Sequence, residues 1–260
     1  MFKPPKPASR PDNAGWLTRL RLFRSDMLRS QPARRYRAWM AEMRTPFYRS
    51  YLVNEPSIFR QVLEAPRDVF PKHPVLGRSL RALLGNSVFV SGGEEWARAR
   101  RIIDPAFEGG RLREAFPPLL AAGKAAVARL APGPLEVEAF TSRIAADVIL
   151  RLLFSTPIED DSAREVFDAF RRYQRAPPLL RPLDLLRAPG WVPRLPRRED
   201  AEARRIRALL TRLVEARLAE IAAGTAPNDL ATRLLTTADP VTGRTFDREE
   251  LVDQVSIFFL

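Results

Sequence analysis

Helical spacing of apolar residues recurs along most of the chain and stops at one proline-dense segment. An amphipathic helix places apolar residues three or four positions apart, so this spacing predicts helices. The predicted helices span residues 16–27, 33–43, 56–63, 94–107, 111–130, 141–153, 161–175, 199–222 and 228–235. Between residues 176 and 198, six prolines exclude regular helix. The chain is therefore predicted to be mainly α-helical with one irregular interruption.

A minor β component and several loops are predicted between these helices. Residues 47–53 alternate and carry aromatic and β-branched side chains, which predicts a strand, and residues 135–138 predict a second, shorter one. Residues 54–56, Asn-Glu-Pro, predict a cap and first turn for the following helix. Residues 66–92 predict a loop with one short apolar stretch, and the Pro-rich, polar residues 1–14 predict a disordered lead-in.

The net charge of +12 raises the prospect of an anionic partner. Only four of the 43 cationic residues are lysines, and the arginines recur from Arg10 to Arg248 without one concentrated block. No helix-turn-helix pattern accompanies them. A basic, all-helical protein that binds nucleic acid or an anionic membrane surface remains an alternative, and salt-dependent binding with a defined site size would support it.

Composition excludes several kinds of site. The chain has no cysteine, which excludes disulfides and thiolate–metal bonds, and its single histidine, His73, excludes a histidine cluster. His73 lies between prolines, which favours a solvated loop position. No apolar run approaches the roughly 20 residues that span a bilayer. The N-terminus lacks the apolar core of a signal peptide, so we expect a cytoplasmic protein.

The stretch from residue 93 to residue 107 is the most informative for function. It places Trp96 and Arg100 four residues apart on a short basic helix, so both side chains share one face. The indole N–H and the guanidinium could then converge on one acidic group, such as a carboxylate. The alternative is a buried tryptophan beside a solvated arginine. Arg98 and Arg101 lie off this face.

The last predicted helix has a clear start and no stop signal. Asp247 and Glu250 form the pattern of a capping box. The sequence then ends in the apolar residues 257–260, without the glycine or asparagine that commonly closes a helix. We therefore expect residues 247–260 to begin a long helix that the chain leaves incomplete.

Five features, in the same order, resemble the N-terminal half of a bacterial cytochrome P-450. They are the strand-to-helix step at 51–56, the loop at 84–89, the helix at 93–107, the Pro-rich segment at 176–198 and the run into a long helix at 239–260. The resemblance implies that residues 15–260 form the N-terminal part of a single cytochrome P-450 domain. It also implies that residues 176–198 form the lid of the substrate pocket and that residues 247–260 begin the central helix.

The resemblance implies haem-dependent monooxygenation of a lipophilic molecule, with electrons from a ferredoxin- or flavodoxin-type donor. Trp96 and Arg100 would bind a haem propionate, and Val88 and Phe89 would shape the substrate pocket. Arg98 and Arg101 would lie on a surface that meets the electron donor. Core packing is the alternative for Phe89, and solvated helix arginines are the alternative for Arg98 and Arg101.

The sequence departs from the family at the residues that perform the chemistry. The cysteine that ligates the iron, the threonine that assists oxygen activation and the Glu-x-x-Arg motif are all absent. The chain thus contains no catalytic residue and no metal ligand. We expect it to be inactive alone.

Overall fold

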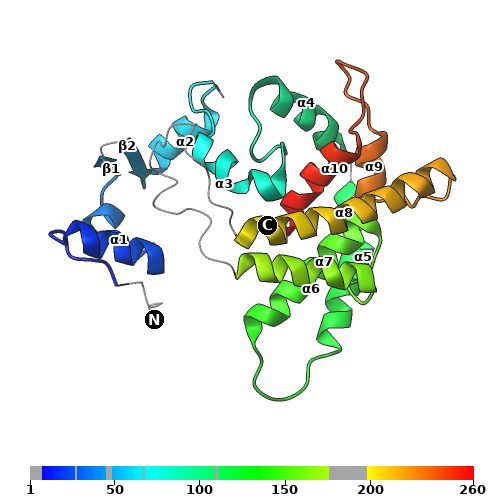
Figure 1. Ribbon diagram of the computed structural model, residues 1–260, viewed down its shortest axis with the longest axis horizontal. Helices are drawn as coiled ribbons and strands as arrows, with labels where there is room; N and C mark the ends of the chain where they lie inside the picture. The colour runs from blue at the N-terminus through cyan, green and yellow to red at the C-terminus, as the bar shows by residue number, and fades with distance from the viewer. Residues whose placement is uncertain (1–7, 27, 45–48, 67, 109–110, 176–197) are drawn as a thin grey trace. The chain divides into compact units, whose positions relative to one another are not determined.

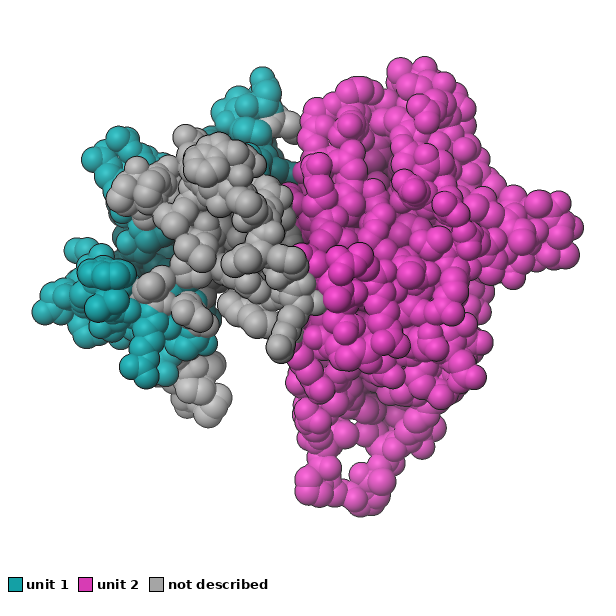
Figure 2. Space-filling view, viewed as in Figure 1, with its two compact units in different colours: residues 1–75, 177–194 teal, residues 76–176, 195–260 magenta. Residues whose placement is uncertain are grey.

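The computed structural model describes residues 8–26, 28–44, 49–66, 68–108, 111–175 and 198–260. The chain forms two compact units (Figure 2), one of residues 1–75 and 177–194 and the other of residues 76–176 and 195–260. We call them unit 1 and unit 2 and describe each by itself. Most of the Pro-rich segment, predicted as a lid, lies outside the described residues.

Unit 1 contains short helices and one hairpin. Its elements are α1 (Trp16–Ser25), a 3₁₀ turn (Ala33–Tyr36), β1 (Met40–Arg44), β2 (Arg49–Val53) and α2 (Pro56–Glu64). The two strands pair antiparallel (Figure 1), with Met40 opposite Val53 and Glu42 opposite Tyr51. Arg10, in the predicted lead-in, forms a parallel bridge with Pro32. The strand expected at 47–53 is confirmed for residues 49–53, and Phe47 is outside the described residues.

The prediction of a helix at residues 33–43 is wrong. A single 3₁₀ turn ends at Tyr36, and Met40–Arg44 is extended because it supplies the hydrogen-bonding partner that β2 needs. The Asn54 amide donates to the carbonyl oxygens of Arg35 and Ala38, at 2.8 and 2.7 Å. Asn54 thus fixes the entry to the hairpin, while α2 starts with Pro56 in its first turn and without a side-chain cap.

Among its described residues, unit 2 has only helices as regular structure. It begins at the third residue of α3 (Pro74–Leu84). Its further elements are α4 (Gly93–Ile103), a 3₁₀ turn (Asp104–Ala106), α5 (Arg111–Val127), α6 (Val137–Phe154), α7 (Asp161–Gln174), α8 (Arg198–Ala222), α9 (Leu230–Thr236), α10 (Arg248–Val255) and a 3₁₀ turn (Ser256–Phe259). Helices α7 and α8 lie side by side, as do α5 and α6 (Figure 1). Helix α9 packs against α6 and α8, and α10 packs against α8.

One continuous apolar core joins the helices of unit 2 other than α5. Its fully buried side chains come from seven helices and the α6–α7 connection, and include Leu83, Ile102, Leu150, Ile158, Val166, Leu210, Leu234 and Leu251. Phe259 stacks on Phe170 of α7, with ring centroids 4.9 Å apart. The 3₁₀ turn after α10 is thereby held against the core.

Two predictions fail in unit 2. Residues 74–84, expected as loop, form α3, whose buried residues Leu80, Leu83 and Leu84 follow helical spacing. Pro74 stands at the first helical position, where it is compatible with a helix. The short strand expected at 135–138 is also wrong, because α6 begins at Val137. Within the described residues, every helix is too short or too polar to cross a bilayer.

Candidate functional site

Helix α4 presents two different faces. Ala99, Ile102 and Ile103 are buried in the core of unit 2. Its first turn carries Glu94 and Glu95 and its last turn carries arginines, an arrangement that complements the helix dipole. The core-facing residues fix the rotation of the helix and so determine where its polar side chains lie.

Trp96 and Arg100 share one face of α4, as the spacing predicts. The guanidinium carbon of Arg100 lies 5.7 Å from the centroid of the Trp96 ring, within the range of a cation–π contact. Arg100 Nη2 also lies 2.8 Å from Asp104 Oδ1, and the Arg100 side chain is 46% exposed. The face therefore binds a carboxylate already. Sequence reasoning missed Asp104, although its spacing of four from Arg100 could have identified it.

The loop from Gly85 to Ser91 carries the two predicted pocket residues. Val88 is half-buried and packs against the core, and its backbone N–H donates to Gln254 Oε1 of α10 at 2.9 Å. Phe89 is 43% exposed. The neighbouring side chains thus differ in environment, and core packing does not account for Phe89. The role of both residues in a substrate pocket stays a prediction.

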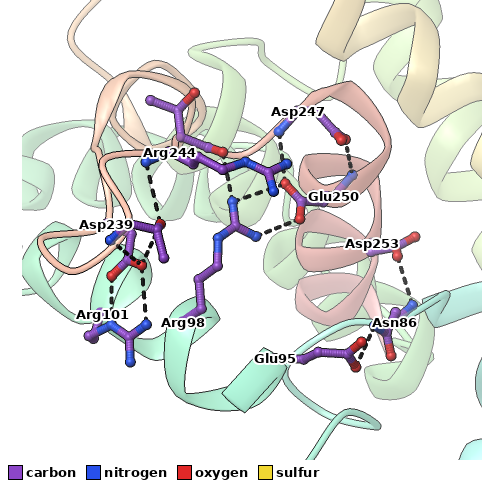
Figure 3. A network of polar contacts seen from close by, with 11 residues as sticks. Asn86, Glu95, Arg98, Arg101, Asp239, Arg244, Asp247, Glu250 and Asp253 are labelled. Atoms are coloured by element: carbon purple, nitrogen blue, oxygen red, sulfur yellow. Dashed lines mark hydrogen bonds and ion pairs between the residues drawn. The ribbon is translucent and has the colours of Figure 1, made fainter.

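Arg98 binds the segment that leads into α10 (Figure 3). Its guanidinium donates to both carboxylate oxygens of Glu250, at 2.5 and 3.3 Å, and to the Thr245 carbonyl oxygen at 2.8 Å. It also lies over the Phe246 ring, 5.6 Å from the centroid. The Arg98 side chain is only 16% exposed, so its interpretation as a solvated helix arginine is wrong.

Arg101 likewise connects α4 to the turn that begins at Asp239, before α10 (Figure 3). Its Nε and Nη2 donate to the two carboxylate oxygens of Asp239, at 2.6 and 3.1 Å, and Nη2 also donates to Glu94 Oε1 at 2.7 Å. Asp239 is fully buried and also accepts a hydrogen bond from the Thr242 hydroxyl at 2.7 Å.

These hydrogen bonds shift the pKa values of both partners. The guanidinium of Arg101, followed by the Thr242 hydroxyl, holds the pKa of Asp239 well below its usual range, against the opposing effect of burial. Hydrogen bonds to Asp239 and then Glu94 raise the pKa of Arg101. Arg98 and Arg101 thus connect α4 to residues 239–250. Whether they also meet an electron donor stays a prediction.

The Cytochrome P450 family profile matches residues 26–260 of the chain. The chain is similar to the cyclooctat-9-en-7-ol 5-monooxygenase of Streptomyces melanosporofaciens, with 32% identity over 227 residues. That alignment covers 85% of this chain and 47% of the relative, so the chain spans about half of the relative's length. Cytochrome P450 4F3 of Rattus norvegicus is 37% identical over 62 residues, which cover 24% of this chain and 12% of that protein.

Solved structures give the same fold. The cytochrome P450DA heme domain superposes with a TM-score of 0.67 at 20% identity, covering 97% of this chain and 55% of that domain. A second cytochrome P450, CYP102L1, gives a TM-score of 0.57 at 23% identity and covers 85% of this chain and 51% of its own. The mainly helical fold with its two-stranded sheet thus matches about half of a P450 heme domain. Together with the profile match over residues 26–260, this similarity shows that the chain belongs to the cytochrome P450 family.

Proposed function

We propose that this chain forms part of a haem-dependent monooxygenase and that its helix α4 binds a haem propionate through Trp96 and Arg100. The observation that carries the proposal is the face they share, where the Arg100 guanidinium pairs with the carboxylate of Asp104. A planar guanidinium suits a carboxylate because two hydrogen bonds can form in parallel. A propionate would take the position of this acidic partner.

In this proposal Trp96 and Arg100 would meet the acidic edge of a haem, and the chain lacks the cysteine thiolate through which the family holds the iron. The chain has no cysteine, and among the described residues no group of three or more potential metal ligands comes together. When bound, the haem supplies the activation of O₂. The residues of this chain orient the propionate side of the haem and shape an apolar surface at Val88 and Phe89. Since none of them is catalytic, the proposal includes that the chain is inactive alone.

The substrate class we propose is a lipophilic small molecule, with a ferredoxin- or flavodoxin-type protein as electron donor. The name of the Streptomyces relative records oxygenation of cyclooctat-9-en-7-ol at position 5, which supports such a substrate. Family membership also favours this function over nucleic-acid or membrane binding as an explanation of the net charge. Several arginines, Arg98 and Arg101 among them, are ion-paired inside the protein and contribute little to an anion-binding surface.

Haem titration of the chain tests the role of α4. We expect Arg100→Ala to weaken haem binding by about fivefold, corresponding to about 1 kcal/mol for a partly exposed ion pair. Binding of haem dimethyl ester, whose propionates carry no charge, should not change. Trp96→Phe, which removes the indole N–H and keeps an aromatic ring, should have a smaller effect in the same direction.

Arg164→Ala provides the control, because Arg164 is an exposed arginine on α7 that pairs with Asp161. It should leave both affinities unchanged. Equal weakening of haem and its ester by Arg100→Ala would contradict a propionate contact, since only the free acid carries the charge that Arg100 is proposed to bind.

The activity is tested at the source locus. We expect the reading frame to continue past the codon for Leu260 into an Ala-Gly-x-x-Thr motif and a cysteine-bearing loop. Expression of that whole frame should give a thiolate-ligated haem that oxygenates an apolar substrate. An in-frame stop directly after Leu260 would rule out a monooxygenase activity for this gene product.

A further inference from the structure

The carboxylate of Asp253 joins three segments that are far apart in the sequence. On α10 itself, Asp253 is largely buried. Its Oδ2 accepts the backbone N–H of Asn86 at 2.7 Å (Figure 3), and its Oδ1 accepts Nη1 of Arg207, on α8, at 2.6 Å. The same Arg207 nitrogen donates to the carbonyl oxygen of Leu83, at the end of α3, at 3.2 Å. A single ion pair therefore connects α8, α10 and the loop from Gly85 to Ser91.

The neighbouring residue of α10 extends this connection. Gln254 Oε1 accepts the backbone N–H of Val88, so α10 binds the loop at two alternate residues through main-chain groups. Main-chain hydrogen bonds do not depend on which side chains the loop carries. The backbone of the loop is thus fixed, while the half-buried Val88 and the exposed Phe89 are not required for the attachment.

Gly85 shows how closely the loop approaches Asp253. Its φ is +51°, in the left-handed region that favours glycine. A Cβ atom built there would lie 1.9 Å from Asp253 Oδ1, far inside van der Waals contact. The carboxylate cannot move away without loss of its contacts to Arg207 and Asn86. The left-handed backbone at position 85 and the lack of room for a side chain there both favour glycine, which allows the loop to approach Asp253 this closely.

We propose that Asp253, Gln254 and Arg207 are positioning residues that set the conformation of loop 85–91 and couple it to the position of α8. Arg207 lies in the third turn of α8, and a displacement of this helix would act on the loop through the Asp253 carboxylate. The coupling itself follows from the contacts of unit 2. Its consequence, control of the pocket surface at Val88 and Phe89, rests on the proposed function.

Amide hydrogen exchange tests the coupling. Removal of one charge-assisted hydrogen bond should speed exchange of the Asn86 and Val88 amides by about tenfold or more in Asp253→Asn and in Arg207→Gln. Arg207→Lys keeps a positive charge and should restore part of the protection. Arg212→Gln is the matched control, because Arg212 lies five residues further along α8 in an exposed pair with Glu165, and it should leave both amides unchanged.

The chain contains no cysteine, so Phe89→Cys introduces a unique thiol for a nitroxide label. We expect the label to become more mobile when Arg207→Gln or Asp253→Asn is added, and not when Arg212→Gln is added. Gln254→Leu should increase mobility as well, because Val88 then loses its acceptor.

Two results would overturn the coupling. One is unchanged exchange and label mobility in both Arg207→Gln and Asp253→Asn. The other is equal acceleration at the Leu150 amide in the centre of α6, since that pattern reports general destabilisation. No haem enters these measurements, and Arg207 is not changed in the haem titration. A failure of the coupling and a failure of the proposed function are therefore distinguishable.

Discussion

Among the described residues, each unit of the protein buries one arginine, and the two arginines find their hydrogen-bond partners in different ways. Arg10 of unit 1 is 8% exposed and Arg217 of unit 2 is 5% exposed. Arg10 donates to main-chain carbonyl oxygens, of Ser30 at 2.6 Å and Pro11 at 2.8 Å. Arg217 pairs with the buried carboxylate of Asp229 and also donates to the Phe154 carbonyl oxygen at 2.8 Å.

The charges that surround arginines also differ between the two units, as Arg10 and Arg101 show. Burial lowers the pKa of Arg10, and the nearby charges of Arg19 and Arg35 lower it further. In unit 2 the bidentate contact with Asp239 raises the pKa of Arg101. Unit 1 thus uses an arginine to hold irregular backbone, whereas unit 2 places arginines against carboxylates that they neutralise.

Apolar burial follows the same division. Among the described side chains of residues 8–75, only Arg10, Ser30 and Pro32 are buried, and large side chains such as Trp16 and Trp39 are exposed. Unit 2 has a continuous core. Burial of apolar surface is the main favourable contribution to folding, so unit 2 should carry most of the stability of the chain.

The largest effect is expected where unit 2 buries opposite charges. Asp229→Ala takes the buried carboxylate from Arg217, which keeps only the exposed Glu220 as an acidic partner, and removes the N-cap of α9, so we expect a loss of about 3–5 kcal/mol in the free energy of unfolding. Urea unfolding measures it. Asp12→Ala in unit 1 is the control, since Asp12 is exposed and lies 3.6 Å from an exposed Arg34, and its effect should stay below about 0.5 kcal/mol.

Equal effects of Asp229→Ala and Asp12→Ala would refute the difference between the units. A large effect of Asp12→Ala alone would show that unit 1 depends on its charges rather than on main-chain contacts.

An effect of similar or somewhat smaller size is expected from the core. Leu150 of α6 is fully buried, and Leu150→Ala should destabilise unit 2 by about 2–5 kcal/mol through lost burial and the cavity left behind. Leu63→Ala on α2 removes a side chain that is mostly exposed and should change stability by about 0.5 kcal/mol or less. Thermal unfolding of the two variants beside the parent chain gives both values. A Leu63→Ala effect as large as that of Leu150→Ala would indicate that α2 is covered in solution.

The sequence predicted unit 2 better than unit 1, for the same physical reason. Helices such as α6 and α7 have a buried face, and its burial requires the helical spacing of apolar residues by which a helix is predicted from sequence. The capping box of Asp247 and Glu250 is present as predicted because both partners lie within one turn. The stretch 33–43 has no buried apolar face in the structure, so its spacing carried no information about packing. Strand β1 exists because β2 lies beside it, which only pairing reveals.

The candidate site shows the same limit. The spacing of Trp96 and Arg100 predicted their shared face, since neighbours on one helix follow from local geometry. The partners of Arg98 and Arg101 could not be predicted, because Glu250 and Asp239 lie 152 and 138 residues away in the sequence. Only the tertiary fold brings them together. The same holds for Asp253 and Asn86, whose contact determines where the loop 85–91 lies.

The smallest effect on the free energy of unfolding concerns Asp239 and appears only at acidic pH. It tests whether Asp239, like Asp229, is a buried carboxylate that an arginine of unit 2 neutralises. Arg101 holds the folded-state pKa of Asp239 below the ordinary value of 3.8. The unfolded state therefore binds more protons as the pH falls through that range, so the stabilisation is complete above about pH 4 and is lost progressively below it. Asp239→Asn cannot titrate, and its free energy of unfolding should fall less steeply with decreasing pH. Arg101→Gln should flatten the same slope. Urea midpoints from neutral to acidic pH measure the difference, and parallel curves for parent and variants would show that Arg101 does not lower the pKa of Asp239.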